Sequence, residues 1–599
     1  MSNVRKIKVN IYGAGISGLT VAHELIEKGF DVTVYEKDQI AGGMARSLRT
    51  EENVPTEHSW RGYGPFYYNT FDIMKRIPYQ EKYNENKLIT TYKGKKYDLT
   101  DFVNDHPGGS LIWKSNNKNL EEVWEKYGYS WHNNNERVQN ILKKYKIENF
   151  ETNSVYDNIS QKGLRWDLLT NDNTQKKGIS LKDYPYVFYN FSKVILSDNR
   201  NQIYYKQRLN DQLRNRVSKK TYNYLVDYLS GPGFGFDKNT MSRGHYAKFI
   251  EYNLQGHGEW KVLNQPTSEG WIEPWVDMLK QKGVRFVFNS EVSKINTNND
   301  KIVNVRLKDD QNTTADLFVM CLNPFAYEKI LQDSNIDEYE KYMNMNIQNN
   351  QISFRLGFNK KIKFKHVNDA FVLLDSPYNI TFYAQDEHWK DGIDLGMDGE
   401  IKTLWSGTCV LPFNNGSLFG KSALSLTLDE LKQEITHQVF ESKELFEIIE
   451  KSNNFQVTRD DIIFTEIFDD WYDSDTGLKT KNKKWVNNNI NEEFRPGNKT
   501  DFTNLYVAGS HTKTTIGVWS MESAVESGKL ASNIILKKYN KKLTYIYKHD
   551  SSIFLKPLKF IDNILYSLYL PNILDTFIII VSIIIIYKLS KKIIKTIKK

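Results

Sequence analysis

The sequence predicts an α/β protein with a small inserted module and a C-terminal membrane helix. Three observations support this prediction: a glycine-rich turn near the N-terminus, a histidine-bearing stretch within residues 88–150, and an apolar run close to the C-terminus. The length of 599 residues suffices for roughly three or four ordinary domains. Hydrophobic residues make up 40% and charged residues 26% of the chain, which excludes wholesale disorder.

The composition excludes further classes of protein. There are only two cysteines, Cys321 and Cys409, so a disulfide framework and a cysteine-rich zinc or iron–sulfur site are excluded. Residues 1–15 contain no long apolar signal region, and we therefore expect a cytosolic body. The abundance of Asn, Lys and Ile is typical of an AT-rich genome, such as that of a giant virus or a protist.

The basic excess lies entirely in the C-terminal tail. After residue 540 there are 11 Lys and 3 Asp without Arg or Glu, which accounts for the whole net charge of +8, and the rest of the chain is balanced at 70 basic and 70 acidic residues. A nucleic-acid binder usually has a basic face on its folded domain, so nucleic acid is not an expected partner. A basic tail beside an apolar run is typical of a membrane-associated protein.

Residues 7–36 have the pattern of a dinucleotide-binding βαβ unit. An apolar strand leads into the turn G-A-G-I-S-G, which contains Gly13, Gly15, Ser17 and Gly18. A helix and a second strand follow, and this strand ends at Glu36. The glycines let the backbone turn sharply and approach a diphosphate at the helix N-terminus, and a carboxylate at position 36 accepts hydrogen bonds from a ribose. We interpret the segment as a Rossmann-type unit; a tight turn in an unrelated α/β unit is the alternative.

A glycine pair follows this unit. Gly42 and Gly43 let a loop run close to the same diphosphate, and Arg46 is placed to neutralise it. This arrangement favours FAD over NAD as the cofactor. A plain flexible loop is the alternative interpretation of the pair.

The stretch 88–150 carries two histidines in a specific context. His106 begins the sequence H-P-G-G, His132 follows 26 residues later, and a short helix is predicted over 138–145. Two neutral imidazoles on opposing helix ends can hold a haem iron from both sides, and the Pro-Gly-Gly turn leads the chain away from the porphyrin edge. The sequence therefore predicts a haem b site with His106 and His132 as the iron ligands.

The central region is predicted to return to the nucleotide-binding fold. The patterns indicate helices over 209–229 and 271–282, and strands over 284–288, 302–307 and 317–322. Near the end, a buried-type strand at 504–509 is followed by a helix at 520–535. Small residues would let this helix pack closely: Ala524, Ser527, Gly528 and Ala531. The partial positive charge at its N-terminus, aimed at a flavin ring, would favour the reduced, anionic flavin.

The final segment is predicted to be a single membrane anchor. Residues 573–589 are nearly all apolar and correspond to roughly 25 Å of helix, slightly short of a ~30 Å hydrocarbon core. Extension back through 565–568 would supply length, with a kink at Pro571. Six lysines follow from Lys588 onward. An interfacial helix and a buried core helix are the alternatives.

Residues 1–80 and 150–540 resemble the flavin-containing amine oxidase and phytoene desaturase superfamily. The sequence P-T-E-H at 55–58 and S-M-E-S-A-V-E-S-G at 520–528 are similar to its carotenoid desaturase branch. The resemblance implies FAD, with the backbone N–H of Met521 at the flavin C2 carbonyl and the backbone of Val292 at the adenine. It also implies that the glycine of the Ala-Gly pair and the residue after it, here Gly509 and Ser510, lie near the flavin ribityl chain or pyrophosphate.

Two departures from that pattern bear on the substrate. Ser510 stands where the family usually has an acidic residue, and Ser520 stands where amine oxidases usually have a cage tyrosine. An amine held between two aromatic faces is therefore less expected than an apolar substrate.

Residues 88–150 resemble cytochrome b5, and His106 and His132 match its axial ligands. The resemblance implies a small α+β haem module inserted into the flavin fold. The expected layout is a first part of the FAD-binding domain (1–87), the haem module (88–150), a substrate or cap region (151–290), the remainder of the FAD-binding and substrate domain (291–540), a basic aromatic linker (541–572), the membrane anchor (573–589) and a lysine-rich tail (590–599).

These expectations together describe a membrane-anchored FAD oxidoreductase. It would take a hydride from an apolar, isoprenoid or lipid-like substrate, and the haem would relay single electrons to an unidentified redox partner. The alternatives are an amine oxidase that releases hydrogen peroxide, and a non-catalytic membrane or virion component with a degenerate flavin fold. No general acid or base is assigned; the candidates by residue type alone are His58, His245, His257 and His511.

Overall fold

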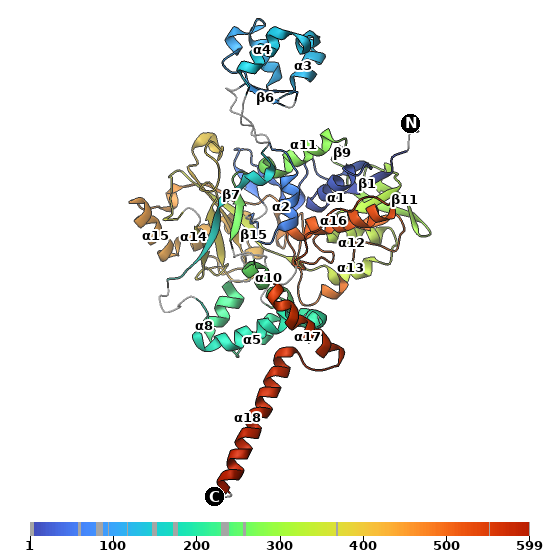
Figure 1. The fold of residues 1–599 in the computed structure, drawn as a ribbon. Coiled ribbons are helices and arrows are strands. Elements are labelled where there is room, and N and C mark those ends of the chain that lie inside the picture. Colours follow the sequence, from blue (N-terminus) through green and yellow to red (C-terminus); the bar gives the residue numbers. More distant parts are fainter. Residues whose placement is uncertain are drawn as a thin grey trace. The chain divides into compact units, whose positions relative to one another are not determined.

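The computed structural model describes residues 5–57, 61–79, 88–93, 95–116, 118–146, 153–171, 178–228, 239–255, 259–366, 369–549 and 552–597. The chain divides into two compact units, a larger one of residues 1–74 and 158–599 and a smaller one of residues 75–157. Figure 1 shows the elements of both. The range 88–150 lies inside the smaller unit.

A five-stranded parallel sheet forms one half of the larger unit. Its order is β23 (Leu505–Val507), β13 (Leu317–Met320), β1 (Lys8–Tyr12), β2 (Asp31–Tyr35) and β9 (Arg285–Val287). All of β13 and the last four residues of β1 are buried, as the near-continuous apolar sequences of central parallel strands require. The strands predicted around these positions are confirmed, with ends that differ by a few residues.

Two helices cover this sheet and pack closely against each other. They are α1 (Ile16–Ile26) and α16 (Met521–Lys538). A Cβ atom at Gly528 would lie 2.7 Å from the Cβ of Thr20 and 2.9 Å from the carbonyl oxygen of Ser17. The predicted helix over 520–535 and its packing through small residues are therefore confirmed.

A seven-stranded mixed sheet forms the other half. Its order is β19 (Ile462–Ile467), β15 (Ile352–Phe358), β18 (Thr403–Cys409), β17 (Ile380–Ala384), β16 (Asp369–Leu373), β7 (Ile159–Leu169) and β8 (Trp260–Leu263). Only the β7–β16 pair in this sheet is parallel. The helices α14 (Leu428–Phe440) and α15 (Lys443–Asn453) bury Leu431, Ile435 and Leu445 in a common core with the sheet.

Smaller elements complete the two halves. The short strands are β3 (Ser47–Arg49), β4 (Pro55–Glu57), β10 (Val292–Asn298), β11 (Lys301–Leu307), β12 (Asn312–Thr313), β14 (Gln348–Asn349), β20 (Trp471–Ser474), β21 (Gly477–Thr480) and β22 (Lys484–Trp485). The helices are α2 (Tyr68–Lys75), α11 (Glu273–Gln281), α12 (Pro324–Asp333) and α13 (Tyr339–Met345).

The region between β7 and β8 is helical, but the single helix predicted over 209–229 is wrong. The chain forms α5 (Tyr184–Ile195), α6 (Asn201–Lys206), α7 (Leu209–Leu213), α8 (Lys219–Tyr222) with a π turn (Asn223–Tyr228), and α10 (Arg243–Gln255). Asn215 has a left-handed backbone with φ of 62°, and Ser218 caps a new helix. These two local preferences interrupt the apolar periodicity; Leu229 and residues 231–233 lie outside the described residues.

Two helices end the chain, α17 (Lys556–Ser567) and α18 (Ile573–Ile597). Backward extension of the anchor through 565–568 is wrong, because Tyr569 has a φ of 57° and Pro571 separates the two helices. The helix instead continues forward through most of the lysine-rich tail. By length and composition, α18 is the one helix among the described residues that could cross a membrane.

The smaller unit has its own core. Its elements are β5 (Ile89–Tyr92), β6 (Lys95–Asp98), α3 (Leu120–Lys126) and α4 (Glu136–Lys144). They enclose a cluster of buried side chains: Leu88, Tyr92, Tyr97, Leu99, Leu120, Trp124 and Leu142. The helix predicted over 138–145 largely coincides with α4.

Candidate functional site

A cavity of about 450 Å³ opens where four parallel strands end. Residues that follow β1, β2, β13 and β23 lie in its wall, which is where open parallel sheets bind ligands. The wall includes eleven of the twelve residues predicted to bind the cofactor: Gly13, Gly15, Ser17, Glu36, Gly42, Gly43, Arg46, Val292, Gly509, Ser510 and Met521. Gly18 is the twelfth, and it lies behind the wall.

The glycine turn is shaped by contacts that exclude side chains. Gly13 has a φ of 101°, and a Cβ atom there would lie 2.4 Å from the carbonyl oxygen of Cys321. A Cβ atom at Gly18 would lie 1.9 Å from the carbonyl oxygen of Gly13, so this glycine serves the packing of α1 against the turn. The first N–H groups of α1 remain unpaired within the helix and suit an anionic diphosphate.

Glu36 lies at the end of β2 with its carboxylate buried. One oxygen accepts the backbone N–H of Ala14 at 2.6 Å, and the other accepts that of Asp38 at 3.1 Å. Burial raises the pKa of Glu36 against the effect of these hydrogen bonds. Each carboxylate oxygen has a second lone pair, so the group can still accept a ribose hydroxyl.

The glycine pair brings a second loop against the turn. Gly42 and Gly43 have φ angles of 108° and 53°, and a Cβ atom at Gly43 would lie 3.2 Å from the Cα of Gly15. The Gly42 N–H donates to the carbonyl oxygen of Ala14 at 2.8 Å. Arg46 lines the cavity and forms an ion pair with Asp38 at 2.5 Å. The loop therefore holds a guanidinium group at the diphosphate side of the cavity.

The N-terminus of α16 forms another part of the wall. Met521 is its first residue, so its N–H has no partner within the helix. Gly509 donates its N–H to the Ser527 hydroxyl at 2.9 Å, and a Cβ atom at Gly509 would lie 2.5 Å from the His511 ring. The lack of a side chain at 509 thus leaves room for the imidazole, and the backbone at 509–510 remains at the cavity.

Lys484 is a functional candidate that the sequence patterns missed. It lies on β22 in the cavity wall, with its ammonium 5.2 Å from the centre of the Trp519 ring and 3.5 Å from the Gln351 side-chain oxygen. No carboxylate among the described residues forms an ion pair with it. Burial, together with the positive charge of Arg61, lowers the pKa of Lys484 to about 7. Nothing in the run K-N-K-K-W-V distinguishes this lysine from its exposed neighbours.

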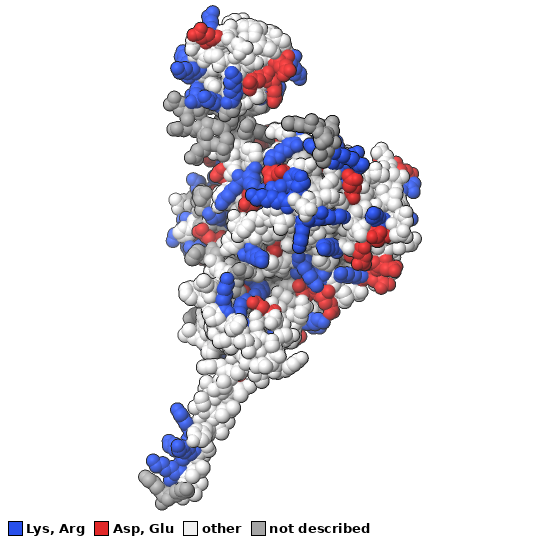
Figure 2. All heavy atoms as spheres, turned by 45° about the vertical axis from the view of Figure 1, so that its right-hand side comes forward, with Lys and Arg blue, Asp and Glu red and all other residues white. Residues whose placement is uncertain are grey.

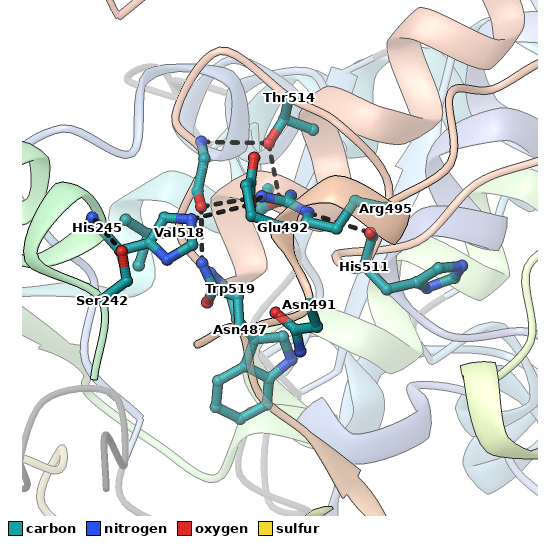
Figure 3. A network of polar contacts seen from close by, with 12 residues as sticks. Ser242, His245, Asn487, Asn491, Glu492, Arg495, His511, Thr514, Val518 and Trp519 are labelled. Atoms are coloured by element: carbon teal, nitrogen blue, oxygen red, sulfur yellow. Dashed lines mark hydrogen bonds and ion pairs between the residues drawn. The ribbon is translucent and has the colours of Figure 1, made fainter. Parts of the chain in front are cut away.

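A buried ionic network supports the loop between β23 and α16 (Figure 3). Glu492 accepts hydrogen bonds from His245 at 2.9 Å and Arg495 at 3.0 Å. Although burial opposes it, these two partners lower the pKa of Glu492 to about 2. Arg495 also donates to the carbonyl oxygens of His511, Thr512 and Gly517, which fixes the path of the loop.

Of the four histidines considered by residue type, the structure describes His245 and His511. Burial, with the charge of Arg495, lowers the pKa of His511 to about 3, so its ring stays neutral. His245 is engaged by Glu492 in the network. His58 and His257 lie outside the described residues.

In the smaller unit, both predicted iron ligands have the ring orientation that a metal requires. The Nδ1 atom of His106 is 3.3 Å from the Gly109 carbonyl oxygen, and that of His132 is 2.8 Å from the Tyr129 carbonyl oxygen. An Nδ1–H that donates to a carbonyl leaves the Nε2 lone pair for iron. Burial lowers the pKa of His106, and the charge of His132 adds to the effect.

Apolar side chains surround these rings in the manner expected for a porphyrin. Trp131 stacks on His132 with ring centres 3.9 Å apart, and Phe102 meets the edge of His106 at 5.8 Å. A Cβ atom at Gly108 would lie 2.9 Å from the His106 ring, so glycine keeps that side clear. Leu111 and Trp131 remain exposed. The residues present therefore fit a bis-histidine haem.

Comparison with known proteins identifies what the larger unit resembles. A model of the family described as flavin containing amine oxidoreductase matches residues 16–378 and 486–536. The solved structure of wild-type putrescine oxidase with bound putrescine is similar over 89% of this chain and 99% of that chain, with a TM-score of 0.54 and 11% identity. At that identity the likeness concerns the fold alone.

Two curated relatives match shorter stretches. A zeta-carotene desaturase from Capsicum annuum is 33% identical over 107 residues, which is 18% of this chain and 18% of the relative. A cytochrome b5-like protein from Acanthamoeba polyphaga mimivirus is 44% identical over 46 residues, which is 8% of this chain and 37% of the relative. This chain therefore covers less than a fifth of the desaturase and little more than a third of the cytochrome b5-like protein.

Proposed function

This chain belongs to the family of flavin-containing amine oxidoreductases, and on that premise we propose that it is an FAD-dependent oxidoreductase acting on an apolar, isoprenoid or lipid-like substrate. The single observation that carries the proposal is the cavity, whose wall gathers the glycine turn, Glu36, the glycine pair and the start of α16. When bound there, FAD supplies an acceptor for the hydride that leaves a C–H bond. The chain's own residues must bind the cofactor, orient the substrate and take up the proton.

The residues that would hold FAD fall into groups, each suited to a different part of the cofactor. The N–H groups at the start of α1 and the Arg46 guanidinium suit the diphosphate, and Glu36 suits a ribose hydroxyl. The N-terminus of α16, at Met521, stabilises negative charge on the ring system. These assignments give Lys484 no role in cofactor binding.

We assign Lys484 the role of proton acceptor in the proposed desaturation. Loss of a hydride from one carbon and of a proton from its neighbour forms a double bond, so a base is needed beside the substrate. With a pKa of about 7, a substantial fraction of Lys484 is neutral near neutral pH and can take this proton. Trp519, beside the ammonium, presents an apolar face suited to an isoprenoid chain.

The proposal includes a haem in the smaller unit and a membrane anchor. His106 and His132 would hold the haem iron, and the haem would supply one-electron chemistry. The apolar helix α18 would hold the protein at a membrane with its body in the cytosol.

An amine oxidase that releases hydrogen peroxide is the second candidate, and the family description favours it. The positive charge of Arg61, which lowers the pKa of Lys484, would also repel an ammonium group bound beside that lysine, and this argues against a protonated amine. The third possibility, a degenerate fold without catalysis, requires that the purified protein bind neither cofactor.

The decisive experiment is an absorption spectrum of the full-length protein, supplied with FAD and haem, before and after dithionite. We expect a flavin band that bleaches and a haem band that sharpens and shifts on reduction. Anaerobic bleaching by an isoprenoid and not by polyamines or monoamines would support the desaturase proposal; peroxide formation from amines alone would favour the second candidate. A colourless protein would overturn both.

A further inference from the structure

Helix α17 buries charged side chains and exposes apolar ones. Its buried residues are Lys559 and Asp562, which are 7% and 0% exposed, whereas Phe560 is 66% exposed. Ile561 and Ile564 are also exposed. A surface helix in water shows the opposite distribution, with apolar residues toward the core and charges outward. The outer face of α17 is therefore built for an apolar environment.

Ion pairs fix this orientation. Lys559 bonds Asp198 at 2.7 Å, and Asp562 accepts the backbone N–H of Ile573 at 2.8 Å. Arg200 lies 3.4 Å from Asp562 and donates to the Leu570 carbonyl oxygen at 2.7 Å. Rotation of α17 to bury its apolar side would separate Lys559 and the fully buried Asp562 from these partners, and loss of a partner by a buried charge is costly. The exposed apolar face is thus a fixed property of the fold.

The neighbouring helix α5 also exposes apolar side chains. Tyr184 and Phe188 are four residues apart in α5, which places them on one side, and Phe188 is 71% exposed; Leu181, in the turn before α5, is exposed as well. Phe554, just before α17, is 84% exposed. In Figure 2 the surface next to the start of α18 is drawn almost entirely without Lys, Arg, Asp or Glu. We call Tyr184, Phe188, Phe554, Phe560 and Ile564 the α5–α17 face.

Helix α18 begins against both α5 and α17. Asp575, in the first turn of α18, pairs with Lys193 of α5 at 2.5 Å. Residues 576–587 carry no charged side chain, a stretch of about 18 Å, which is short of a ~30 Å hydrocarbon core. Lysines beyond it can reach outward along their stems, but the base of α18 must still lie close to the lipid for the helix to span.

We infer that the α5–α17 face seats the body of the protein in the interfacial layer of a lipid bilayer, around the base of α18. This inference rests on the proposed anchor and extends it, because it adds a second contact with the membrane that no spanning segment provides. Lipid is the occupant that fits, since the face is apolar, aromatic at its edge and directly joined to the apolar helix.

The test places one fluorescent label at a time on the full-length protein in phosphatidylcholine vesicles. Cys321 and Cys409 are buried and free, so introduced cysteines are labelled selectively. Phe188→Cys and Phe560→Cys report on the face, Ile579→Cys reports on α18, and Lys451→Cys on the exposed side of α15 is the control. The fluorescence of each label is measured with iodide as the quencher in the water and, separately, with nitroxide lipids as the quencher in the bilayer.

We expect labels at 188 and 560 to be quenched by nitroxide lipids and to be protected from iodide several-fold relative to the label at 451. Iodide quenching at 188 and 560 equal to that at 451, with 579 in lipid, would overturn the inference and leave the anchor standing. Protection from iodide without quenching by lipid would mean that a second copy covers the face, which also overturns it. If 579 itself is quenched by iodide, the proposed anchor fails and the inference fails with it.

Discussion

Lys484 shows how one residue acquires its chemistry from burial. A lysine in water is charged throughout the physiological range, whereas the wall of the cavity and the charge of Arg61 lower the pKa of Lys484 to about 7. The negative charge of Asp470 raises the pKa of Lys484, but it offsets only part of this decrease. Burial without a bonded carboxylate is costly for stability, and such sites are frequently functional.

If Lys484 is the proton acceptor, the rate of substrate-dependent flavin reduction should rise with pH and level off above about 7, because the neutral amine accumulates there. Lys484→Met should lower this rate by roughly 10²–10⁴-fold, the usual contribution of a general base, and abolish the pH dependence. Lys484→Arg keeps the charge without the base and should be equally slow. Stopped-flow absorbance at several pH values measures this; a Met variant with an unchanged pH profile would remove Lys484 from the mechanism.

Glu492 should make the larger unit sensitive to acid. Its pKa is 4.5 as a free group and about 2 in the fold, so its stabilisation is complete above pH 4.5 and is lost as the pH falls toward 2. The difference corresponds to roughly 3 kcal/mol. Glu492→Gln should therefore lower the free energy of unfolding at neutral pH and flatten its decline between pH 4.5 and 2. Tryptophan fluorescence measures the unfolding, and Glu447→Gln, at an exposed position, is the control.

The α1–α16 pair is the element on which the cavity depends most. Both helices begin at its wall, and their close contact sets where their N-termini point. Gly528 allows this contact, because any side chain there meets Thr20 and the backbone of Ser17. A small residue that does not line the cavity therefore controls the geometry of two helix N-termini.

Gly528→Ala should push α16 away from α1. The added methyl would clash with Thr20 and a backbone oxygen, and overpacking of this kind costs about 1–3 kcal/mol. We expect a lower melting temperature and faster release of FAD on dilution. Gly497→Ala is a matched control, because a Cβ atom there meets no atom within 4 Å. Equal FAD retention by both variants would show that the helix contact does not position the cofactor site.

At the level of the complete molecule, two units with separate cores divide the proposed redox chemistry. The larger unit contains the cavity and the smaller unit contains the paired imidazoles. Flavin exchanges two electrons and haem one, so the two sites together can convert a hydride transfer into single-electron steps.

His106→Ala and His132→Ala should each abolish the haem band and leave FAD content and substrate-dependent bleaching unchanged, because each unit has its own core. His366→Ala, at an exposed position of the larger unit, should retain both cofactors. Absorbance and iron content measure the result. Loss of FAD from either haem-ligand variant would contradict the independence of the two units.

The sequence by itself determined the features that depend on local chain geometry. The glycine turn, the helix at 520–535 and the apolar C-terminal run are readable because φ angles, helix periodicity and hydrophobicity are set by near neighbours. The assignment of His106 and His132 as iron ligands rests on sequence context and stays a prediction.

Only the tertiary structure decided which charged side chains were buried and what surrounded them. Lys484 lies against Trp519 and Gln351, Glu492 bonds His245, and α17 turns its charges inward, all through contacts between residues distant in the chain. The helix break at Asn215 and the separate start of α18 also differ from the longer helices that the apolar pattern predicted. Burial and charge pairing are properties of packed neighbours, so periodicity along the chain does not encode them.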